Sequence, residues 1–201
     1  MKRYDVPRII FVNKLDRLGA DPWAAVEGAR QRLGLNAAAV QVNIGIENGL
    51  EGVIDLVKMK ACYFDGDNGE IVREEEIPAD LVEIAKEKKL ELISCLAECG
   101  EETMEEYFLD EQVDIPEEEL KECIRKNTIN LKFCPVFLGS AYKNKGVQKM
   151  LDGVIDYLPN PKQVSNYAYN VNKEGEKTEM VIDNKKPFVA LAFKLEETKF
   201  G

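Results

Sequence analysis

The chain has 201 residues, of which 45% are hydrophobic and 32% are charged, and its net charge is −10. This length and apolar content allow one or two domains with a buried core, and no apolar run is long enough to cross a membrane. Five cysteines without a Cys-x-x-Cys pair argue against a zinc site, and the lack of histidine excludes a Ser-His or Cys-His mechanism within the chain.

Two strand-then-helix patterns lie near the two ends of the chain. Residues 6–12 form an apolar run typical of a strand covered on both faces, and Asp21 and Pro22 begin a helix that Gly34 ends. The second strand is Cys134–Leu138, and the helix after it carries an apolar face made by Val147, Leu151, Val154, Ile155 and Leu158. These patterns predict an α/β fold with a parallel sheet.

A different unit lies between these two patterns. Residues 40–64 are rich in β-forming stretches, and three helices are predicted over 80–99, 101–110 and 116–128. Residues 65–126 contain 22 acidic and 7 basic side chains, a net charge of −15, whereas the remaining residues carry 15 acidic and 20 basic side chains. This asymmetry predicts a separate acidic unit inserted into the α/β domain.

The end of the chain resembles a linker followed by the start of another domain. Residues 161–185 have little periodicity, and "PFVALAFKL" over 187–195 alternates as a strand does. A single strand without a partner is not a domain. We therefore expect the chain to be a piece of a longer protein.

The stretch "IIFVNKLDR" ends an apolar strand in a cluster of polar side chains. Asp16 can accept hydrogen bonds from the N1–H and the exocyclic amine of guanine, which together contribute roughly 3–6 kcal/mol at roughly 1.5–3 kcal/mol each. Asn13 can bond the base N7 and brace neighbouring loops, Lys14 can lay its methylene stem along the purine, and Leu15 faces the core. The alternative interpretation is an ordinary loop at the end of a strand.

The second strand ends in "GSA", which strengthens the guanine interpretation. Ser140 is placed to steady the Asp16 carboxylate, and the backbone N–H of Ala141 is placed to donate to guanine O6. The apolar strand in front of Asn13 supports the same interpretation. The sequence therefore predicts a nucleotide-binding site formed by Asn13, Lys14, Leu15, Asp16, Ser140 and Ala141.

The stretches "VPRIIFVNKLDRLGADP", "GVIDLVKMKA", "GSAYKNKGVQKMLDGVIDYLPNP" and "KPFVALAFK" resemble elongation factor G, a translational GTPase family. The resemblance covers essentially the whole chain. It implies the C-terminal half of a P-loop GTPase-type parallel sheet, with an inserted α+β subdomain and the first strand of a β-barrel. The implied boundaries are residues 1–38 and 130–160 for the GTPase domain, 39–129 for the insert, 161–185 for a linker and 186–201 for the barrel.

By this resemblance the full-length protein uses GTP hydrolysis to drive ribosomal translocation of tRNA and mRNA, with GTP or GDP and Mg²⁺ as ligands. The phosphate-binding loop Gly-x-x-x-x-Gly-Lys-Ser/Thr is absent from the sequence. We therefore expect a missing N-terminal part of the protein to bind the phosphates and Mg²⁺. We therefore expect the chain alone to be inactive. Asp16–Gly19 matches the Asp-x-x-Gly pattern, but it overlaps the base motif and is not expected to sense a γ-phosphate.

The acidic insert has two interpretations. It is either a set of solvated helix faces or a docking surface for a basic partner, and the resemblance implies the ribosomal stalk protein. Within the insert, "DGDNGEIVREEE" over residues 65–76 partly fits a calcium loop, but Glu70 stands where that loop needs glycine. We expect a turn between two strands at this point.

The sequence leaves other functions open. The same family resemblance admits the paralogous factor that recycles ribosomes, and a non-catalytic acidic docking module is an alternative from another class. "YFDGDNGEIVR" and "YLPNP" resemble the mitochondrial form, which implies the mitochondrial matrix, or the cytoplasm for a bacterial protein.

Overall fold

The computed structural model describes residues 2–173, 175–183 and 185–194. The chain divides into two compact units, one ending at Leu158 and the other beginning at Pro159. The first unit contains both predicted strand–helix patterns and residues 39–129, which were predicted as an inserted subdomain and are called the insert below.

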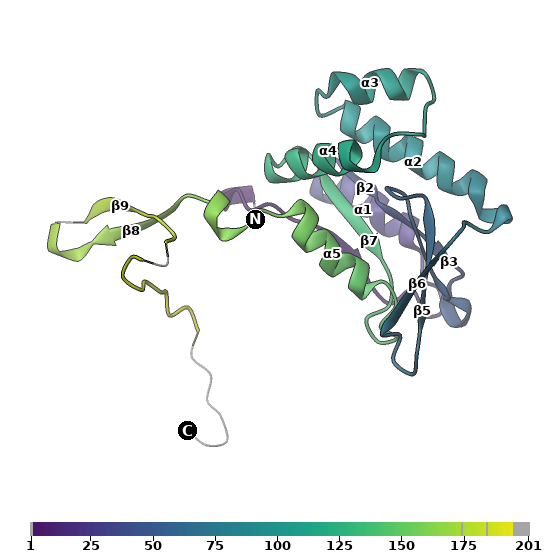
Figure 1. Cartoon of the computed structure of the whole chain (residues 1–201), viewed down its shortest axis with the longest axis horizontal. Helices are drawn as coiled ribbons and strands as arrows, with labels where there is room; N and C mark the ends of the chain where they lie inside the picture. The colour runs from purple at the N-terminus through teal and green to yellow at the C-terminus, as the bar shows by residue number, and fades with distance from the viewer. Residues whose placement is uncertain (1, 174, 184, 195–201) are drawn as a thin grey trace. The chain divides into compact units, whose positions relative to one another are not determined.

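A three-stranded parallel sheet is the centre of the first unit (Figure 1). Its order is β1 (Ile10–Val12), β7 (Cys134–Leu138) and β2 (Ala37–Ala39), so strands far apart in the sequence are neighbours. This confirms the predicted parallel sheet. The first strand is shorter than the predicted residues 6–12, because only Ile10–Val12 pairs with β7 and nothing in the described chain pairs with its other edge.

The segment between α1 (Pro22–Leu33) and β7 builds a second layer of structure (Figure 1). Four antiparallel strands follow one another in the order β3 (Gln41–Ile44), β4 (Gly52–Asp55), β5 (Lys60–Asp65) and β6 (Ile71–Glu75). Three helices then follow: α2 (Val82–Ala97), α3 (Glu102–Leu109) and α4 (Glu117–Ile129). The predicted β-rich stretch and the three predicted helices are thus present, with ends shifted by one or two residues.

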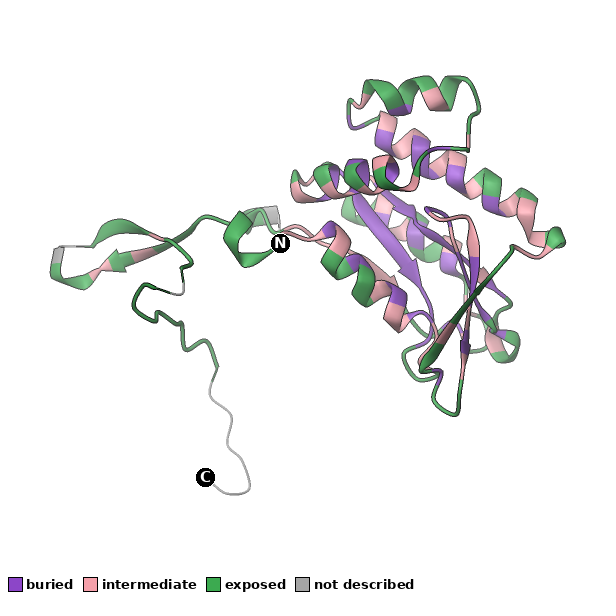
Figure 2. Ribbon diagram, in the orientation of Figure 1, coloured by how far each residue is buried: buried purple, intermediate pink, exposed green. Residues whose placement is uncertain are grey.

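Buried residues line both layers of the first unit (Figure 2). Ala85, Leu92 and Leu96, which recur at helical spacing on α2, are buried, and so is Cys99 just after the helix. The cysteines are free and pack as small apolar side chains. Burial raises the pKa of the Cys62, Cys95 and Cys134 thiols to about 11, so none of these three is a reactive thiolate at neutral pH.

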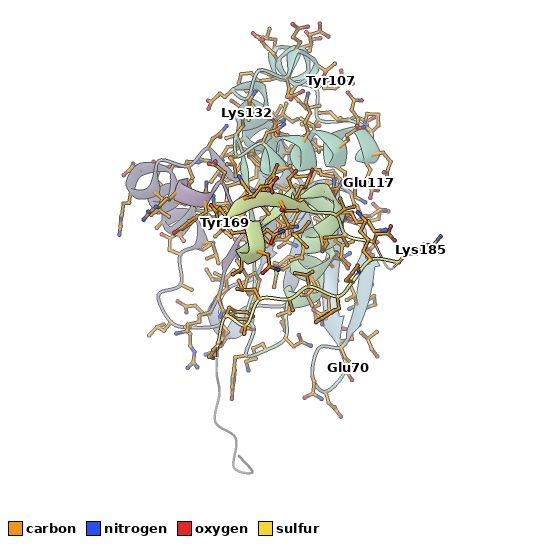
Figure 3. All side chains as sticks on the ribbon, turned by 90° about the vertical axis from the view of Figure 1, so that its left-hand side faces the viewer. Glu70, Tyr107, Glu117, Lys132, Tyr169 and Lys185 are labelled. Carbon is orange, nitrogen blue, oxygen red and sulfur yellow. The ribbon has the colours of Figure 1, made fainter. Side chains whose placement is uncertain are left out.

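The acidic side chains of α3 and α4 lie mainly on the exposed side of these helices. The two helices and the loop between them expose eight acidic residues, namely Glu102, Glu105, Glu106, Asp110, Glu111, Asp114, Glu118 and Glu122. We call these eight residues the acidic surface. Tyr107 on α3 donates a hydrogen bond to Glu119 of α4, at 3.3 Å, and Figure 3 labels Tyr107 and Glu117 on this part of the molecule.

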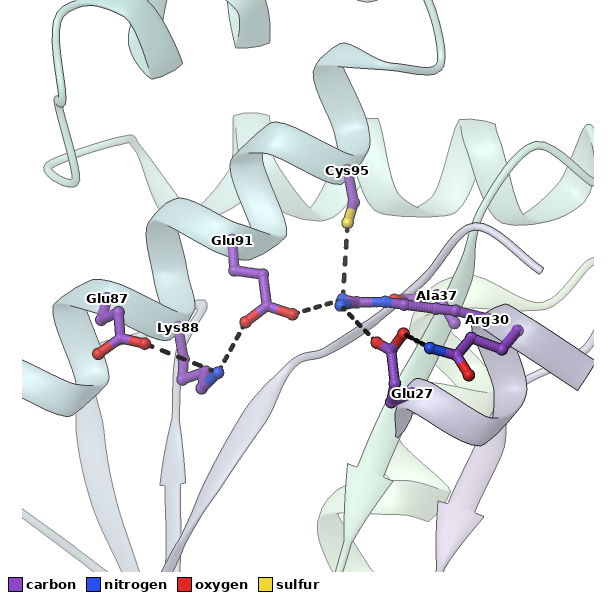
Figure 4. A network of polar contacts seen from close by, with 8 residues as sticks. Glu27, Arg30, Ala37, Glu87, Lys88, Glu91 and Cys95 are labelled. Atoms are coloured by element: carbon purple, nitrogen blue, oxygen red, sulfur yellow. Dashed lines mark hydrogen bonds and ion pairs between the residues drawn. The ribbon is translucent and has the colours of Figure 1, made fainter. Parts of the chain in front are cut away.

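Arg30 joins α1 to α2 (Figure 4). Its guanidinium donates to the backbone oxygen of Ala37 at 2.6 Å and forms an ion pair with Glu91 of α2, and Glu91 also accepts from Lys88 at 2.8 Å. Asp21 caps α1 through its contact with the N–H of Ala24, and Gly34 ends the helix with a φ of 59°, as predicted. The helix of the α/β pattern is therefore fastened directly to the insert.

Helix α5 (Val147–Tyr157) forms where it was predicted but presents the other face to the core. Leu151, Val154 and Ile155 are exposed, whereas Lys149, Gly153 and Tyr157 are buried. Lys149 forms an ion pair with Glu74 of β6, and Gly153 lets the helix lie against the ring of Phe137. The shared apolar face is therefore not the packed face of α5 in the described structure, because Gly153 and the paired Lys149 lie against the neighbouring strands.

The second unit contains a hairpin within the residues predicted as a linker. Strands β8 (Asn166–Asn170) and β9 (Glu176–Met180) pair antiparallel after a short 3₁₀ turn, Pro161–Gln163. No strand occurs over residues 187–194, so the predicted barrel strand is not formed in the part of it that the structure describes. Residues 195–201 lie outside the described residues. Among the described helices, none has the length and apolar character needed to span a membrane.

Candidate functional site

Two loops lie side by side at the carboxyl edge of the parallel sheet. We call residues 13–20, after β1, the first loop and residues 139–146, after β7, the second loop. Leu15 anchors the first loop because its side chain is only 1% exposed and its N–H donates to the oxygen of Gly139 at 3.1 Å. Leu15 therefore faces the core as predicted, while Asn13 and Lys14 remain exposed.

Asp16 of the first loop is held by Ser140 of the second loop. The Ser140 hydroxyl donates to Asp16 Oδ1 at 2.6 Å, and the Asp16 side chain is 6% exposed. This hydrogen bond lowers the pKa of Asp16, with smaller contributions from the positive charges of Arg17 and Lys143, against the opposing effect of burial. Asp16 is therefore a fixed carboxylate at neutral pH, which is what a group that accepts from two base donors requires.

Asn13 forms the second bridge between the loops. Its Oδ1 accepts from the N–H of Lys14 at 2.7 Å and from the N–H of Ala141 at 2.9 Å. The bracing role predicted for Asn13 is thus present in the geometry. The N–H of Ala141, expected to face guanine O6, donates to Asn13 instead, so an O6 atom at this position would share that N–H or displace the Asn13 oxygen.

The structure brings residues to this edge that the sequence motifs did not single out. Tyr142 is 80% exposed beside the site, and the Arg17 guanidinium lies 5.7 Å from the centre of its ring. Glu47, from the insert, accepts from the N–H of Gly19 at 2.7 Å. The aromatic residue directly after "GSA" was a usable signal for Tyr142, but Glu47 has no sequence signal because its contact is tertiary.

The side chains of the calcium-like stretch and of the Asp-x-x-Gly stretch bind other parts of the protein. Asp65 of the calcium-like stretch accepts from Arg73 near the turn between β5 and β6, where Figure 3 labels Glu70. Glu76 pairs with Lys60 at the opposite end of the same hairpin, so both side chains link the two strands. No cluster of three or more potential metal-binding side chains occurs among the residues described. In the Asp-x-x-Gly stretch, Asp16 accepts a hydrogen bond from the Ser140 hydroxyl, and the N–H of Gly19 donates to the Glu47 carboxylate.

A cavity of about 300 Å³ lies away from the two loops. Residues of β3, β4, α4 and α5 line it, including Asp55, Lys149 and Tyr157. The pKa of Asp55 is raised by burial, against the hydrogen bonds that it accepts from the N–H groups of Val57 and Lys58. The candidate base site is thus an open edge of the sheet and not this cavity.

A parallel sheet with paired polar loops at its carboxyl edge is the arrangement of nucleotide-binding α/β domains. The model of the elongation factor Tu GTP binding domain matches residues 1–160, and the chain belongs to this family. Over all 201 residues it is 49% identical to elongation factor G 2 of Anaeromyxobacter dehalogenans (strain 2CP-C) and 49% identical to the mitochondrial elongation factor G-1 of Arabidopsis thaliana. The resemblance to elongation factor G is thereby confirmed.

The chain spans about a quarter of the length of these relatives, 28% of the first and 26% of the second. A crystal structure of a protein from Thermus thermophilus matches 84% of the chain, and 25% of that protein, with a TM-score of 0.67 and 24% identity. This similarity shows a shared fold.

Proposed function

We propose that the complete protein is an elongation factor G that hydrolyses GTP to drive the movement of tRNA and mRNA on the ribosome. The support is its membership of the GTP-binding family together with 49% identity to two proteins of that name. The observation that carries the proposal is the bond of Ser140 to Asp16, because it fixes a carboxylate at the edge where a base would lie. The relatives' name favours translocation over ribosome recycling and over a non-catalytic docking module.

The proposed contribution of this chain is recognition of guanine. Asp16 accepts from the N1–H and the exocyclic amine, Lys14 covers one face of the purine, and Tyr142 is exposed on the second loop to cover the other. Adenine presents an acceptor where guanine has its N1–H, and it would leave a charged acceptor unpaired. Charged hydrogen bonds of roughly 1.5–3 kcal/mol each correspond to a discrimination of roughly 10²–10⁴.

Phosphate binding and hydrolysis are assigned to other parts of the protein. The support is that the sequence has no phosphate-binding loop, the element that holds the phosphates and Mg²⁺ in P-loop GTPases. We expect the 201 residues alone to bind GTP or GDP weakly and not to hydrolyse GTP. In this proposal residues 1–38 and 130–160 belong to the GTPase domain, 39–129 to the insert, 161–185 to a linker and 186–201 to the second domain.

The acidic surface is proposed to dock the ribosomal stalk protein. Its eight carboxylates are exposed, and so are Phe108 and Leu109 at the end of α3, at 41% and 72%. A negatively charged surface that also exposes apolar side chains suits a basic partner that offers apolar contacts. The proposed interaction weakens with rising salt, and contact with tRNA and mRNA is left to other parts of the complete factor.

The proposed location is the mitochondrial matrix. Its support is the mitochondrial relative and the resemblance of "YFDGDNGEIVR" and "YLPNP" to the mitochondrial form. Fractionation of cells that express the tagged complete protein tests this proposal, since recovery in the cytoplasm would contradict it.

Substitution of Asp16 by Asn tests the proposed base recognition in the protein expressed from its complete reading frame. We expect GDP affinity to fall by roughly 10²-fold or more, because the amide offers one acceptor where guanine needs two. Affinity for xanthosine diphosphate should rise, because the new amide N–H can donate to the C2 carbonyl of xanthine. Isothermal titration with both nucleotides measures the exchange of specificity.

The matched control is Asp110→Asn at the exposed end of α3, which makes the same chemical change outside the site. It should leave both affinities unchanged. If Asp16→Asn left GDP affinity unchanged and gave no gain for the xanthosine nucleotide, the assignment of the site would be wrong.

A further inference from the structure

A single turn of the insert contacts both the first loop and the second loop. This turn, Glu47–Gly49 with Leu50 after it, lies between β3 and β4. The N–H of Glu47 donates to the oxygen of Leu15 at 2.7 Å, and its carboxylate accepts from the N–H of Gly19 at 2.7 Å. The first loop, which carries Asp16, is therefore held at two points on either side of that residue.

The same turn also holds the second loop. The ammonium group of Lys145 donates to the oxygen of Leu50 at 2.7 Å, and the backbone of Lys145 exchanges two hydrogen bonds with Ser140. Since Ser140 is the residue that binds Asp16, the turn is connected to the Asp16 carboxylate from both sides. The side chains that make this connection are the Glu47 carboxylate on the first loop and the Lys145 ammonium group on the second.

The hairpin of β5 and β6 adds a second brace to the second loop. Asn144 donates through Nδ2 to the oxygen of Asn68 at 2.9 Å, and Gln148 donates to the oxygen of Gly69 at 2.7 Å. A Cβ atom on Gly69 would lie 2.9 Å from the oxygen of Asn144, so the hairpin turn and the loop are packed backbone to backbone. In Figure 1 the end of this hairpin lies near the loop that leads into α5.

Three residues in these contacts have a positive φ, which residues other than glycine rarely adopt. Glu47 has a φ of 57° and Asn144 a φ of 49°, and Lys14 of the first loop has a φ of 67°. Non-glycine residues persist in the left-handed region where the surrounding structure holds them, and such residues concentrate at functional sites. The strained residues and the braces therefore occur in the same small region.

From these contacts we propose that the insert positions the guanine-reading loops, with Glu47 and Asn144 as positioning residues for base specificity. The proposal rests on the proposed recognition of guanine by Asp16 and adds the residues that hold this carboxylate in place. A loop that is already ordered binds its ligand without the entropic cost of ordering. When the braces are removed, Asp16 moves relative to the base, and its bond to the exocyclic amine contributes less.

The experiment compares GDP with inosine diphosphate, which lacks the exocyclic amine, in the protein expressed from its complete reading frame. Glu47→Gly and Asn144→Gly remove each bracing side chain and retain a residue that accepts a positive φ. In each variant, the Kd for inosine diphosphate divided by the Kd for GDP should fall by about 10-fold, which corresponds to about 1.4 kcal/mol. Because both affinities are measured on one sample, the ratio does not depend on the fraction of folded protein.

Two controls separate positioning from general stability. Glu47→Gln keeps an oxygen that can accept from the Gly19 N–H, so it should keep the wild-type ratio. Glu51→Gln, an exposed residue four positions along, should also keep it. A purely structural role of Glu47 would weaken both nucleotides equally and leave the ratio at the wild-type value.

The outcomes distinguish the two proposals. If the wild-type protein prefers GDP to inosine diphosphate and the glycine variants keep this preference, the positioning role is wrong while the base site stands. If the wild-type protein shows no preference, the base site itself is wrong, and the positioning role falls with it. A reduced ratio in both glycine variants, with wild-type ratios in Glu47→Gln and Glu51→Gln, supports the positioning role.

Discussion

At the scale of single residues, the site depends on a few short contacts between chain segments that are far apart in the sequence. Ser140 is completely buried, and its hydroxyl donates to Asp16 while accepting from the N–H of Lys143 at 3.2 Å. Asn13 uses one oxygen for two backbone N–H groups. These side chains hold the two loops together before any base arrives, which reduces the cost of ordering them on binding.

Replacement of Ser140 by Ala tests the cause of the lowered Asp16 pKa. The hydrogen bond is the largest contribution, so its loss should raise the pKa of Asp16 towards the ordinary value of about 3.9. A depressed pKa stabilises the fold above the unfolded-state value, and this stabilisation is lost as the pH falls through the folded-state pKa. In the variant, protonation of Asp16 should therefore begin at a higher pH.

Carbon-13 NMR of the aspartate carboxyl groups follows this titration directly. Asp65 is an internal control, because its pKa is lowered by Arg73 and not by Ser140. An unchanged Asp16 titration in Ser140→Ala would show that the neighbouring charges, and not the hydroxyl, keep this carboxylate ionised.

At the scale of elements, α5 shows how packing partners override an apolar pattern. The exposed face carries Leu151, Val154 and Ile155, while Gly153 and Lys149 face the protein. The pKa of Lys149 is raised: burial alone would lower it, but the hydrogen bond to Glu74 and the nearby negative charges, Asp55 among them, together outweigh that effect. The pairing of a buried lysine with an exposed glutamate and a close helix–strand contact therefore decide which side of the helix is covered.

The substitution Gly153→Ala tests the closeness of this contact. A Cβ atom at this position would lie 2.1 Å from the ring of Phe137, which is itself buried and close to Tyr157, with ring centres 6.2 Å apart. We expect the free energy of unfolding to fall by about 1–3 kcal/mol, as for other overpacked cores. Urea unfolding measures the change.

Gly28→Ala in α1 is the matched control, since it is also a glycine inside a helix. Its added Cβ atom would have Arg32 Nε, at 3.9 Å, as its nearest neighbour. Alanine there should increase stability by about 0.5–1 kcal/mol because of its higher helix propensity. Equal effects of the two substitutions would contradict the packing of α5 against Phe137.

At the scale of the whole molecule, the apolar cores lie in the first compact unit. The three clusters of buried apolar residues fall between Leu15 and Tyr157, whereas most described residues beyond Pro159 are exposed. Stability of the described chain therefore comes mainly from residues up to Leu158, since burial of apolar surface is the dominant favourable contribution to folding.

A chain that ends after Leu158 should unfold at the same urea concentration as the 201-residue chain. The expected difference in the free energy of unfolding is about 0.5 kcal/mol or less, the scale of changes outside a core. Trp23, the single tryptophan, packs against two of the clusters and reports unfolding by its fluorescence in both proteins. A clearly lower midpoint for the shorter chain would show that the second unit contributes to the stability of the first.

The sequence by itself determined the local features of this protein. Its apolar runs and caps predicted β7, α1 and the three helices of the insert, and its motifs identified the family and the polar loop residues. These features depend on short-range periodicity, capping and residue type, which are visible in consecutive residues.

Only the tertiary structure decided which residues from distant parts of the sequence contact one another. The packed face of α5 and the engagement of the Ala141 N–H by Asn13 differ from what the sequence indicated, and the pairing of β8 with β9 was not predicted. The contact of Glu47 with the first loop was not foreseen. Each depends on atoms separated by many residues or on a choice between competing partners, and such choices are made by packing and hydrogen bonding in the folded chain.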